Sequence, residues 1–196
     1  MLAPIETTRL WLRPLTLADL PFLVALNADP VVARHLATGK PRTEAETRQW
    51  FDKTMAWYEQ DGTGHRGVVL KDGDRLVGRC GLQCMEVELD AARPRAFFGR
   101  ASAPPGVRAE PILELGYGLV PEAWGKGIAS EASRRMRDEG FARGEAKLMS
   151  VIHADNAASI RVAVKNGLSL AGELEFLGRV FLRYEITREE WQALPA

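Results

Sequence analysis

The sequence has little of three features that would each indicate a special class of protein. It holds 2 cysteines among 196 residues, and its 26 basic residues balance 26 acidic ones, so its formal net charge is zero. Binding to nucleic acid depends on a surplus of Lys and Arg, so a balanced chain is not expected to bind it. No apolar run approaches the roughly 20 residues of a membrane span, and the first ten residues lack the pattern of a secretory signal. These absences predict a cytoplasmic protein without a membrane partner.

The cysteines and histidines do not form a metal-binding pattern. Cys80 and Cys84 lie four residues apart on one face of an alternating stretch, where they are expected to be buried thiols rather than a disulfide or a metal site. His35, His65 and His153 have no ligand spacing, so no metal is expected. A surface or capping role is the commoner one for such histidines. His65 precedes a hairpin strand that could border a substrate, and it is kept as a candidate substrate contact.

The composition is that of a globular protein, with 46% hydrophobic and 27% charged residues. Without an internal repeat or a linker, residues 1–196 are expected to form a single domain. Alternating and helical spacings of apolar residues predict the elements. The expected strands are 8–15, 67–71, 75–84, 112–120, 147–152, 168–176 and 180–186, and the main expected helices are 16–27, 43–60, 125–143 and 156–166. This order predicts an α/β or α+β fold with helices packed on a sheet.

Residues 85–110 differ from the rest because Ala, Arg and Pro dominate and no period is sustained. They are interpreted as a long excursion between two strands, of the kind that is usually functional or mobile. Four arginines in it could receive an acidic substrate, although a solvated loop is the simpler interpretation. They are Arg93, Arg95, Arg100 and Arg108.

The most informative stretch is ELGYGLVPEAWGKGIASEA, residues 114–132. A strand runs to Pro121, and a short loop with Gly125 and Gly127 then opens a helix. Glycines at such a junction let backbone amides converge on an anion, and the helix dipole adds to the attraction. A tight turn from strand to helix would need the same glycines, so the pair alone does not decide between the two roles.

Four segments together resemble the GCN5-related N-acetyltransferases, and within them the branch of the ribosomal-protein N-terminal acetyltransferases. They are TTRLWLRPLTLAD at 7–19, LVGRCGL at 76–82, residues 114–132, and NAASIRVAVKNGL at 156–168. They follow the family's order and cover nearly all of the chain except residues 85–110. The resemblance implies a single domain whose mixed, mostly antiparallel sheet splays into a V with helices on both faces. Acetyl-CoA would lie in the opening as co-substrate, and a homodimer is compatible with the branch.

The resemblance also implies which residues hold acetyl-CoA. WGKGIA falls on the family's acyl-CoA loop, where backbone amides would bind the pyrophosphate. Main-chain groups of Leu119 and Val120 match those that pair with the pantetheine arm, and Asn156 falls near the same arm, although Asn is also a common helix N-cap. The expected cofactor-binding residues are therefore Leu119, Val120, Trp124, Gly125, Lys126, Gly127, Ile128, Ala129 and Asn156.

Two residues are candidates for the chemistry of amine acetylation. Glu114 shares a strand face with Gly116 and Gly118, so its carboxylate could accept the amine proton in an open cleft; the alternative is a solvent-facing or salt-bridged Glu. The family's helix Tyr, which protonates the leaving thiolate, is replaced here by Ala163. Ser159 remains in the first turn of that helix as a hydrogen-bond donor to the sulfur, or simply as a residue of the helix start.

These residues predict an acetyl-CoA-dependent N-acetyltransferase that transfers the acetyl group directly to a primary amine. The acceptor is left open between the α-amine of a protein N-terminus and a small-molecule amine. The alternative is a non-catalytic acyl-CoA-binding or interaction module on the same scaffold, which the missing helix Tyr favours.

Overall fold

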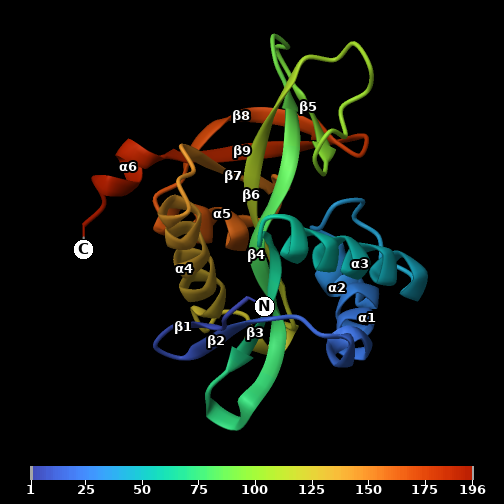
Figure 1. Cartoon of the computed structure of the whole chain (residues 1–196), viewed down its shortest axis with the longest axis vertical. Coiled ribbons are helices and arrows are strands. Elements are labelled where there is room, and N and C mark those ends of the chain that lie inside the picture. The colour runs from blue at the N-terminus through green and yellow to red at the C-terminus, as the bar shows by residue number, and fades with distance from the viewer. Residues whose placement is uncertain (1, 196) are drawn as a thin grey trace. The chain divides into compact units, whose positions relative to one another are not determined.

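The computed structural model describes residues 2–195, and within them the chain forms six α-helices and nine strands in an α/β arrangement (Figure 1). It consists of two compact units. Unit 1 comprises the chain through Gly81 together with Gly116–Met136, and unit 2 comprises Leu82–Leu115 and Arg137 onward. Among residues 2–195, no helix has the length and apolar character needed to cross a membrane.

Unit 1 contains β1 (Ile5–Glu6), β2 (Leu10–Pro14), β3 (Gly64–Leu70), the first half of β4 (Arg75–Glu88) and the end of β6 (Ala109–Leu119). Strands β1, β2 and β3 pair antiparallel. The predicted alternation in β2 is confirmed: Leu10 and Leu12 are fully buried, whereas Trp11 between them is 37% exposed. The two leucines therefore anchor β2 in the core of this unit.

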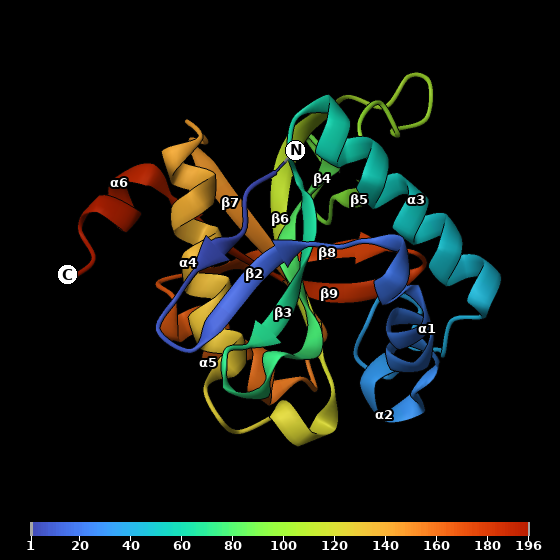
Figure 2. The ribbon, with the colours of Figure 1, turned by 60° about the horizontal axis from the view of Figure 1, so that its bottom comes forward.

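The helices of unit 1 are α1 (Leu20–Ala28), α2 (Pro30–Ala33), α3 (Glu44–Gln60) and the first half of α4 (Ile128–Ala142). The predicted start of α3 is confirmed by a capping box, in which Glu46 N–H donates to Thr43 Oγ1 at 3.2 Å and Thr43 N–H donates to the Glu46 carboxylate at 2.7 Å. Helix α1 packs against α2 and α3 (Figure 2). This helical layer fixes the loop of residues 34–43 that leads into α3.

The turn between β3 and β4 is an Asp-Gly turn, with φ of 75° at Gly73 and 46° at Asp74. Two glycines of β4 then allow the backbones of neighbouring strands to approach closely. A Cβ at Gly78 would lie 2.3 Å from the Gly118 carbonyl oxygen, and one at Gly81 would lie 2.3 Å from the Gly64 carbonyl oxygen. Only glycine fits at either position without moving a strand.

Gly81→Ala should therefore destabilise the protein by about 3 kcal/mol or more, because the added methyl group overlaps backbone atoms that cannot rotate away. Gly118→Ala is the matched control, since its Cβ would make ordinary contacts with no atom nearer than 3.7 Å. Urea denaturation measures both. Equal midpoints for the two variants would contradict the close approach of β3 and β4.

Unit 2 contains the rest of β4 and β6 with β5 (Arg95–Phe98), β7 (Lys147–Ile152), β8 (Ser169–Phe176) and β9 (Arg179–Thr187), in the order β4-β5-β8-β9-β7-β6. Its sheet is mixed: β5–β8 and β6–β7 are parallel, and the other pairs are antiparallel. Helices α5 (Ala157–Lys165) and α6 (Arg188–Gln192) complete the unit with the end of α4. Its core includes Met85, Val87, Ala96, Ile112, Met149, Leu174 and Phe181.

The expectation that residues 85–110 form an irregular excursion is wrong where strands lie within it, at the end of β4, in β5 and at the start of β6. Strand β4 continues to Glu88, and β5 pairs back onto it with Met85 opposite Phe98. The turn after β5 is tied to β4 because the Glu86 carboxylate accepts the backbone N–H groups of Ala101, Ser102 and Ala103 at 2.7–2.8 Å. These hydrogen bonds lower the pKa of Glu86. The segment therefore contains a hairpin of β4 and β5, and the loop that follows β5 is held by Glu86.

Three of the four arginines of this segment form ion pairs within it or with β8. Arg93 pairs with Glu173 at 3.0 Å, and Arg108 pairs with Asp90 at 2.7 Å. Arg95 pairs with Glu88 at 2.8 Å, and its guanidinium hydrogen bonds lower the pKa of Glu88 to about 2. Each of these three arginines therefore already has a carboxylate partner within the chain, so its charge is balanced without an acidic substrate.

A second correction concerns the start of α4, which was expected at Gly125 and is found at Ile128. Pro121–Ala123 form a single 3-10 turn after β6, and Gly125 and Gly127 follow with φ of 71° and 74°. Left-handed residues cannot be part of an α-helix, so both glycines belong to the loop. Elsewhere the boundaries agree closely: β7 is found at Lys147–Ile152 as predicted.

Candidate functional site

The loop of residues 124–127 in unit 1 leads from β6 into the N-terminus of α4. All four residues are exposed. A Cβ at Gly125 would have no atom within 4 Å, and one at Gly127 would have only Arg9 Nη2, at 3.4 Å. The space in front of this backbone is therefore open, so a ligand can approach the main chain directly. The first turn of the 15-residue helix α4 adds backbone N–H groups and the positive end of the helix dipole.

This loop fits a pyrophosphate well. When two left-handed glycines precede a helix, successive backbone N–H groups point toward one side and form a concave site for an anion. The predicted pyrophosphate residues all lie at this junction: Gly125, Lys126 and Gly127 in the loop, and Ile128 and Ala129 in the first turn of α4. A tight turn needs the same glycines, and the turn glycines Gly73 and Gly178 have equally open Cβ positions, so the open space alone does not decide between the two roles.

The main chain just before the loop is already hydrogen bonded within unit 1. Val120 N–H donates to Val77 C=O at 2.9 Å, and Val120 C=O accepts from Ala123 N–H at 3.0 Å. Leu119 C=O accepts from the Trp124 indole N–H at 2.9 Å. The Val120 N–H is therefore bonded to β4 and is not available to the pantetheine arm. The groups left to pair with that arm are the main chain of Leu119 and the second lone pairs of the Leu119 and Val120 carbonyl oxygens.

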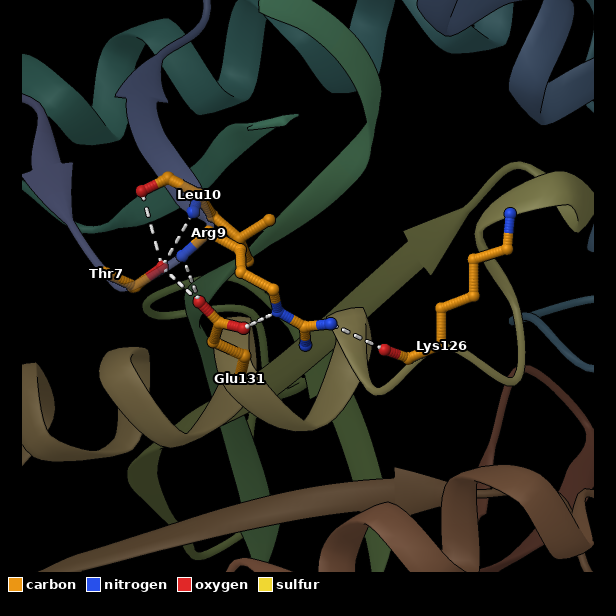
Figure 3. A network of polar contacts seen from close by, with 5 residues as sticks. All are labelled: Thr7, Arg9, Leu10, Lys126 and Glu131. Carbon is orange, nitrogen blue, oxygen red and sulfur yellow. Dashed lines mark hydrogen bonds and ion pairs between the residues drawn. The ribbon is translucent and has the colours of Figure 1, made fainter. Parts of the chain in front are cut away.

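The exposed loop is held by a network of polar contacts that joins it to the N-terminal strands (Figure 3). Arg9 donates from Nη1 to Lys126 C=O at 2.9 Å and from Nε to Glu131 Oε2 at 2.6 Å. The other oxygen of Glu131 accepts from Thr7 Oγ1 at 2.6 Å and from Arg9 N–H at 2.8 Å. Because both ends of the guanidinium are fixed, Arg9 ties the loop carbonyl to the first turn of α4.

The carboxylate of Glu131 is stabilised in its charged form. Its partial burial opposes ionisation, but the hydrogen bonds from Thr7 and Arg9 outweigh that and lower its pKa below the ordinary 4.5. The ion pair with Arg9 is therefore intact at neutral pH and is lost only as the pH falls through that lowered pKa. Glu131 and Arg9 belong to the segments that carry the family resemblance, but no role was predicted for either.

Glu131→Gln, which removes the charge from this network, should weaken the binding of CoA. We expect a rise in Kd of about 3- to 10-fold, the effect of losing roughly 1 kcal/mol of charge-assisted hydrogen bonding that holds the loop. Isothermal titration with CoA measures it. Glu6→Gln is the matched control, because Glu6 pairs with Lys71 at 2.6 Å and does not contact the loop. An unchanged Kd would show that the network does not position the loop.

Glu114, the candidate base, lies on β6 in unit 2. Glu114 is 6% exposed, and its Oε2 accepts a hydrogen bond from Gln83 Nε2 at 2.7 Å. Its burial rules out the solvent-facing alternative. Gln83 on β4 was not predicted to have a role; it fixes one carboxylate oxygen. A buried carboxylate with one oriented oxygen suits an acceptor of protons.

Asn156 and Ser159 are brought together at the start of α5 in unit 2. Asn156 is the N-cap, and its Oδ1 accepts the backbone N–H of Ser159 at 3.1 Å. The capping alternative is therefore confirmed for Asn156, and Ser159 occupies the third helical position with a partly exposed side chain. Ala163 is buried one turn further on, where the family's Tyr would stand.

An open glycine loop at a helix N-terminus is a feature of sites that bind a phosphate-bearing ligand. Comparison with family models gives the particular class. Residues 9–169 match the acetyltransferase (GNAT) domain, a range that runs through both units. The chain belongs to the GNAT acetyltransferases: it is an N-acetyltransferase, and its family uses acetyl-CoA.

Similarity to individual proteins agrees with this assignment. The "uncharacterized N-acetyltransferase p20" of Bacillus licheniformis is 29% identical over 173 residues, covering 85% of this chain and 82% of that protein. The acetyltransferase of Agrobacterium tumefaciens has a similar structure, with a TM-score of 0.72 and 23% identity over 96% of each chain. The ribosomal-protein-S5-alanine acetyltransferase of Vibrio fischeri gives a TM-score of 0.69 at 17% identity, covering 96% of this chain and 98% of that one. At these identities the two structures establish the fold.

Proposed function

We propose that this enzyme transfers the acetyl group of acetyl-CoA directly to a primary amine, without a covalent acetyl-enzyme. The acceptor is the α-amine of a protein N-terminus or an amine of a small molecule. The observation that carries the proposal is the open loop of residues 124–127 with its two left-handed glycines. The resemblance of the chain to the ribosomal-protein branch, together with the acceptor named for the Vibrio fischeri neighbour, supports a protein N-terminus. We propose the cytoplasm as the compartment.

In unit 1, the amides of Gly125, Lys126, Gly127, Ile128 and Ala129 hold the pyrophosphate of acetyl-CoA. Trp124 is 42% exposed and donates its indole N–H to Leu119 C=O, so its ring covers the end of β6 where Leu119 pairs with the pantetheine arm. Arg9 and Glu131 keep the loop in the conformation that presents these amides. Because they act through the loop, they are positioning residues.

In unit 2, Glu114 accepts the proton of the acceptor ammonium, directly or through a water, and leaves the amine able to attack. The thioester supplies an activated acetyl carbonyl and a thiolate leaving group. Ser159 donates a hydrogen bond to the developing charge on sulfur, since a Ser hydroxyl is too weak an acid to protonate a thiolate outright. Asn156 caps α5 and lies beside the pantetheine arm. The replacement of the family's Tyr by Ala163 leaves the thiolate to take its proton from solvent.

The experiment that tests this proposal measures thiol release from acetyl-CoA with a colour reagent, across N-terminal peptides, amino acids, polyamines and aminoglycosides. We expect release that depends on one acceptor class, with one acetylated amine formed per thiol. CoA binding without release for any amine would contradict the proposal and support the alternative of a non-catalytic acyl-CoA-binding module. Release without an acetylated product would indicate hydrolysis.

A further inference from the structure

The carboxylate of the candidate base is held by a neutral side chain from the neighbouring strand of unit 2. Strands β4 and β6 pair, and Leu89 N–H, just after β4, donates to Arg108 C=O, just before β6, at 2.8 Å. In an antiparallel register, six residues back along β4 and six residues forward along β6 place Gln83 opposite Glu114. Their hydrogen bond of 2.7 Å is therefore a direct cross-strand contact, set by the pairing of two strands and by no loop.

Both side chains lie on the sheet face that carries the core of unit 2. Met85 and Val87 follow Gln83 at alternate positions of β4, and Ile112 precedes Glu114 by two positions on β6. All three belong to one buried apolar cluster, and alternate residues of a strand share a face. The carboxylate of Glu114 thus borders apolar side chains, where a charge is costly unless a hydrogen-bond donor compensates for the lost water.

Gln83 supplies such a donor without adding a charge. An ionised carboxylate only accepts hydrogen bonds, so Gln83 must direct its NH₂ group toward Glu114, as the contact of Nε2 with Oε2 shows. A Lys or Arg at this distance would form an ion pair and lower the affinity of the carboxylate for a proton. A neutral amide orients the carboxylate and stabilises its charge by hydrogen bonding alone, which leaves it a stronger base than an ion pair would.

We propose that Gln83 is a positioning residue of the acetyl transfer, which holds the carboxylate of Glu114 in the orientation that takes the proton of the acceptor ammonium. The inference rests on the proposed function, because that function makes Glu114 the base. During the transfer the N–H bond of the ammonium breaks and an O–H bond forms on the carboxylate, while Gln83 keeps its own protons. Since Gln83 acts through Glu114, its loss affects turnover and leaves the affinity for CoA unchanged.

The test is a double-mutant cycle of Gln83→Met and Glu114→Gln, since Met is similar in length to Gln but has no N–H donor. Thiol release is followed near neutral pH at saturating acetyl-CoA and saturating amine, with the most active amine of the acceptor panel. In the wild type, Gln83→Met should lower kcat by roughly 10- to 100-fold, the effect of losing a hydrogen bond to a charged group. In the Glu114→Gln background it should change kcat by less than about twofold, because no carboxylate is left to position. The Kd for CoA, measured by calorimetry, should be the same in all four proteins.

Two further variants separate positioning from stability. Val87→Ala, on the same face of β4, removes buried packing from a side chain that is 5% exposed, so it should lower the urea midpoint and leave kcat unchanged. The exchanged pair, Gln83→Glu with Glu114→Gln, keeps the cross-strand hydrogen bond with donor and acceptor reversed, and it tests the inference even if Gln83→Met does not fold. Its kcat should stay as low as that of Glu114→Gln, because the carboxylate has moved to β4.

Wild-type kcat for Gln83→Met would overturn the inference, as would the same fold-loss in both backgrounds, because Gln83 would then act on the fold and not through the base. Restored activity in the exchanged pair would overturn it as well. In each of these cases a slow Glu114→Gln variant leaves the proposed function standing. If Glu114→Gln turns over like the wild type, or if no amine is acetylated, the assignment of the base fails and the role of Gln83 fails with it.

Discussion

Glu114→Gln should lower kcat by about 10²- to 10⁴-fold near neutral pH, the contribution of a positioned general base. Gln cannot accept the amine proton, yet it matches Glu in size and its amide oxygen can still accept from Gln83 Nε2. The fold and the affinity for CoA should therefore remain close to those of the wild type. Steady-state thiol release measures kcat, and calorimetry measures the Kd for CoA.

The pH dependence of this variant distinguishes a base from a structural residue. An α-amine has an ordinary pKa of about 8, so above about pH 9 most of the acceptor is already deprotonated and needs no base. The defect of Glu114→Gln should thus shrink as the pH rises. Glu110→Gln, at an exposed position of the same strand, is the control and should behave as the wild type. A defect of constant size across the pH range would contradict the role of Glu114 as the base.

Gly127→Val should raise the Kd for CoA by about 10- to 100-fold, because a β-branched residue is strained by about 1–3 kcal/mol at a φ of 74° and fills the open space beside the loop amides. Gly178→Val is the matched control. Gly178 lies in the β8–β9 turn with a φ of 72° and has no atom within 4 Å of its Cβ position, so it carries the same strain away from the loop. Calorimetry measures CoA binding, and urea denaturation measures stability.

If both valine variants lose similar stability and only Gly127→Val loses CoA affinity, the loop is the pyrophosphate site. Equal CoA affinity of Gly127→Val and the wild type would remove the assignment of residues 124–129. Since kcat at saturating acetyl-CoA reports on the chemistry in unit 2, it should change much less than Kd in this variant.

Local chemistry made much of the fold predictable. The helix start at Thr43 and the Asn156 N-cap each depend on a few neighbouring residues, and both are found as expected. The apolar run of Lys147–Ile152 gave the bounds of β7. By contrast, β5 is only 4 residues long and is defined by its partners, so its own sequence has no visible period.

The contacts that matter most for the site were not predictable because they join residues far apart in the chain. Arg9 and Glu131 are separated by 122 positions, and Gln83 and Glu114 by 31. In the sequence, Glu131 is simply an acidic residue in the first turn of a helix. Acidic residues are favoured there by the helix dipole, so its presence needs no other explanation. His65 likewise gave no sign of burial, because its neighbours in β3 are buried on both faces of the strand and leave no alternation to interpret.

We propose that this chain acetylates amines with Glu114 as the base. The most direct test follows one turnover of enzyme-bound acetyl-CoA with an amine acceptor near neutral pH, and quantifies both free CoA thiol and acetylated amine by mass spectrometry for the wild type and Glu114→Gln. We expect equal amounts of thiol and acetylated amine from the wild type, with both formed at least about 100-fold more slowly by the variant. Equal rates for the two proteins, or thiol without acetylated amine, would contradict it.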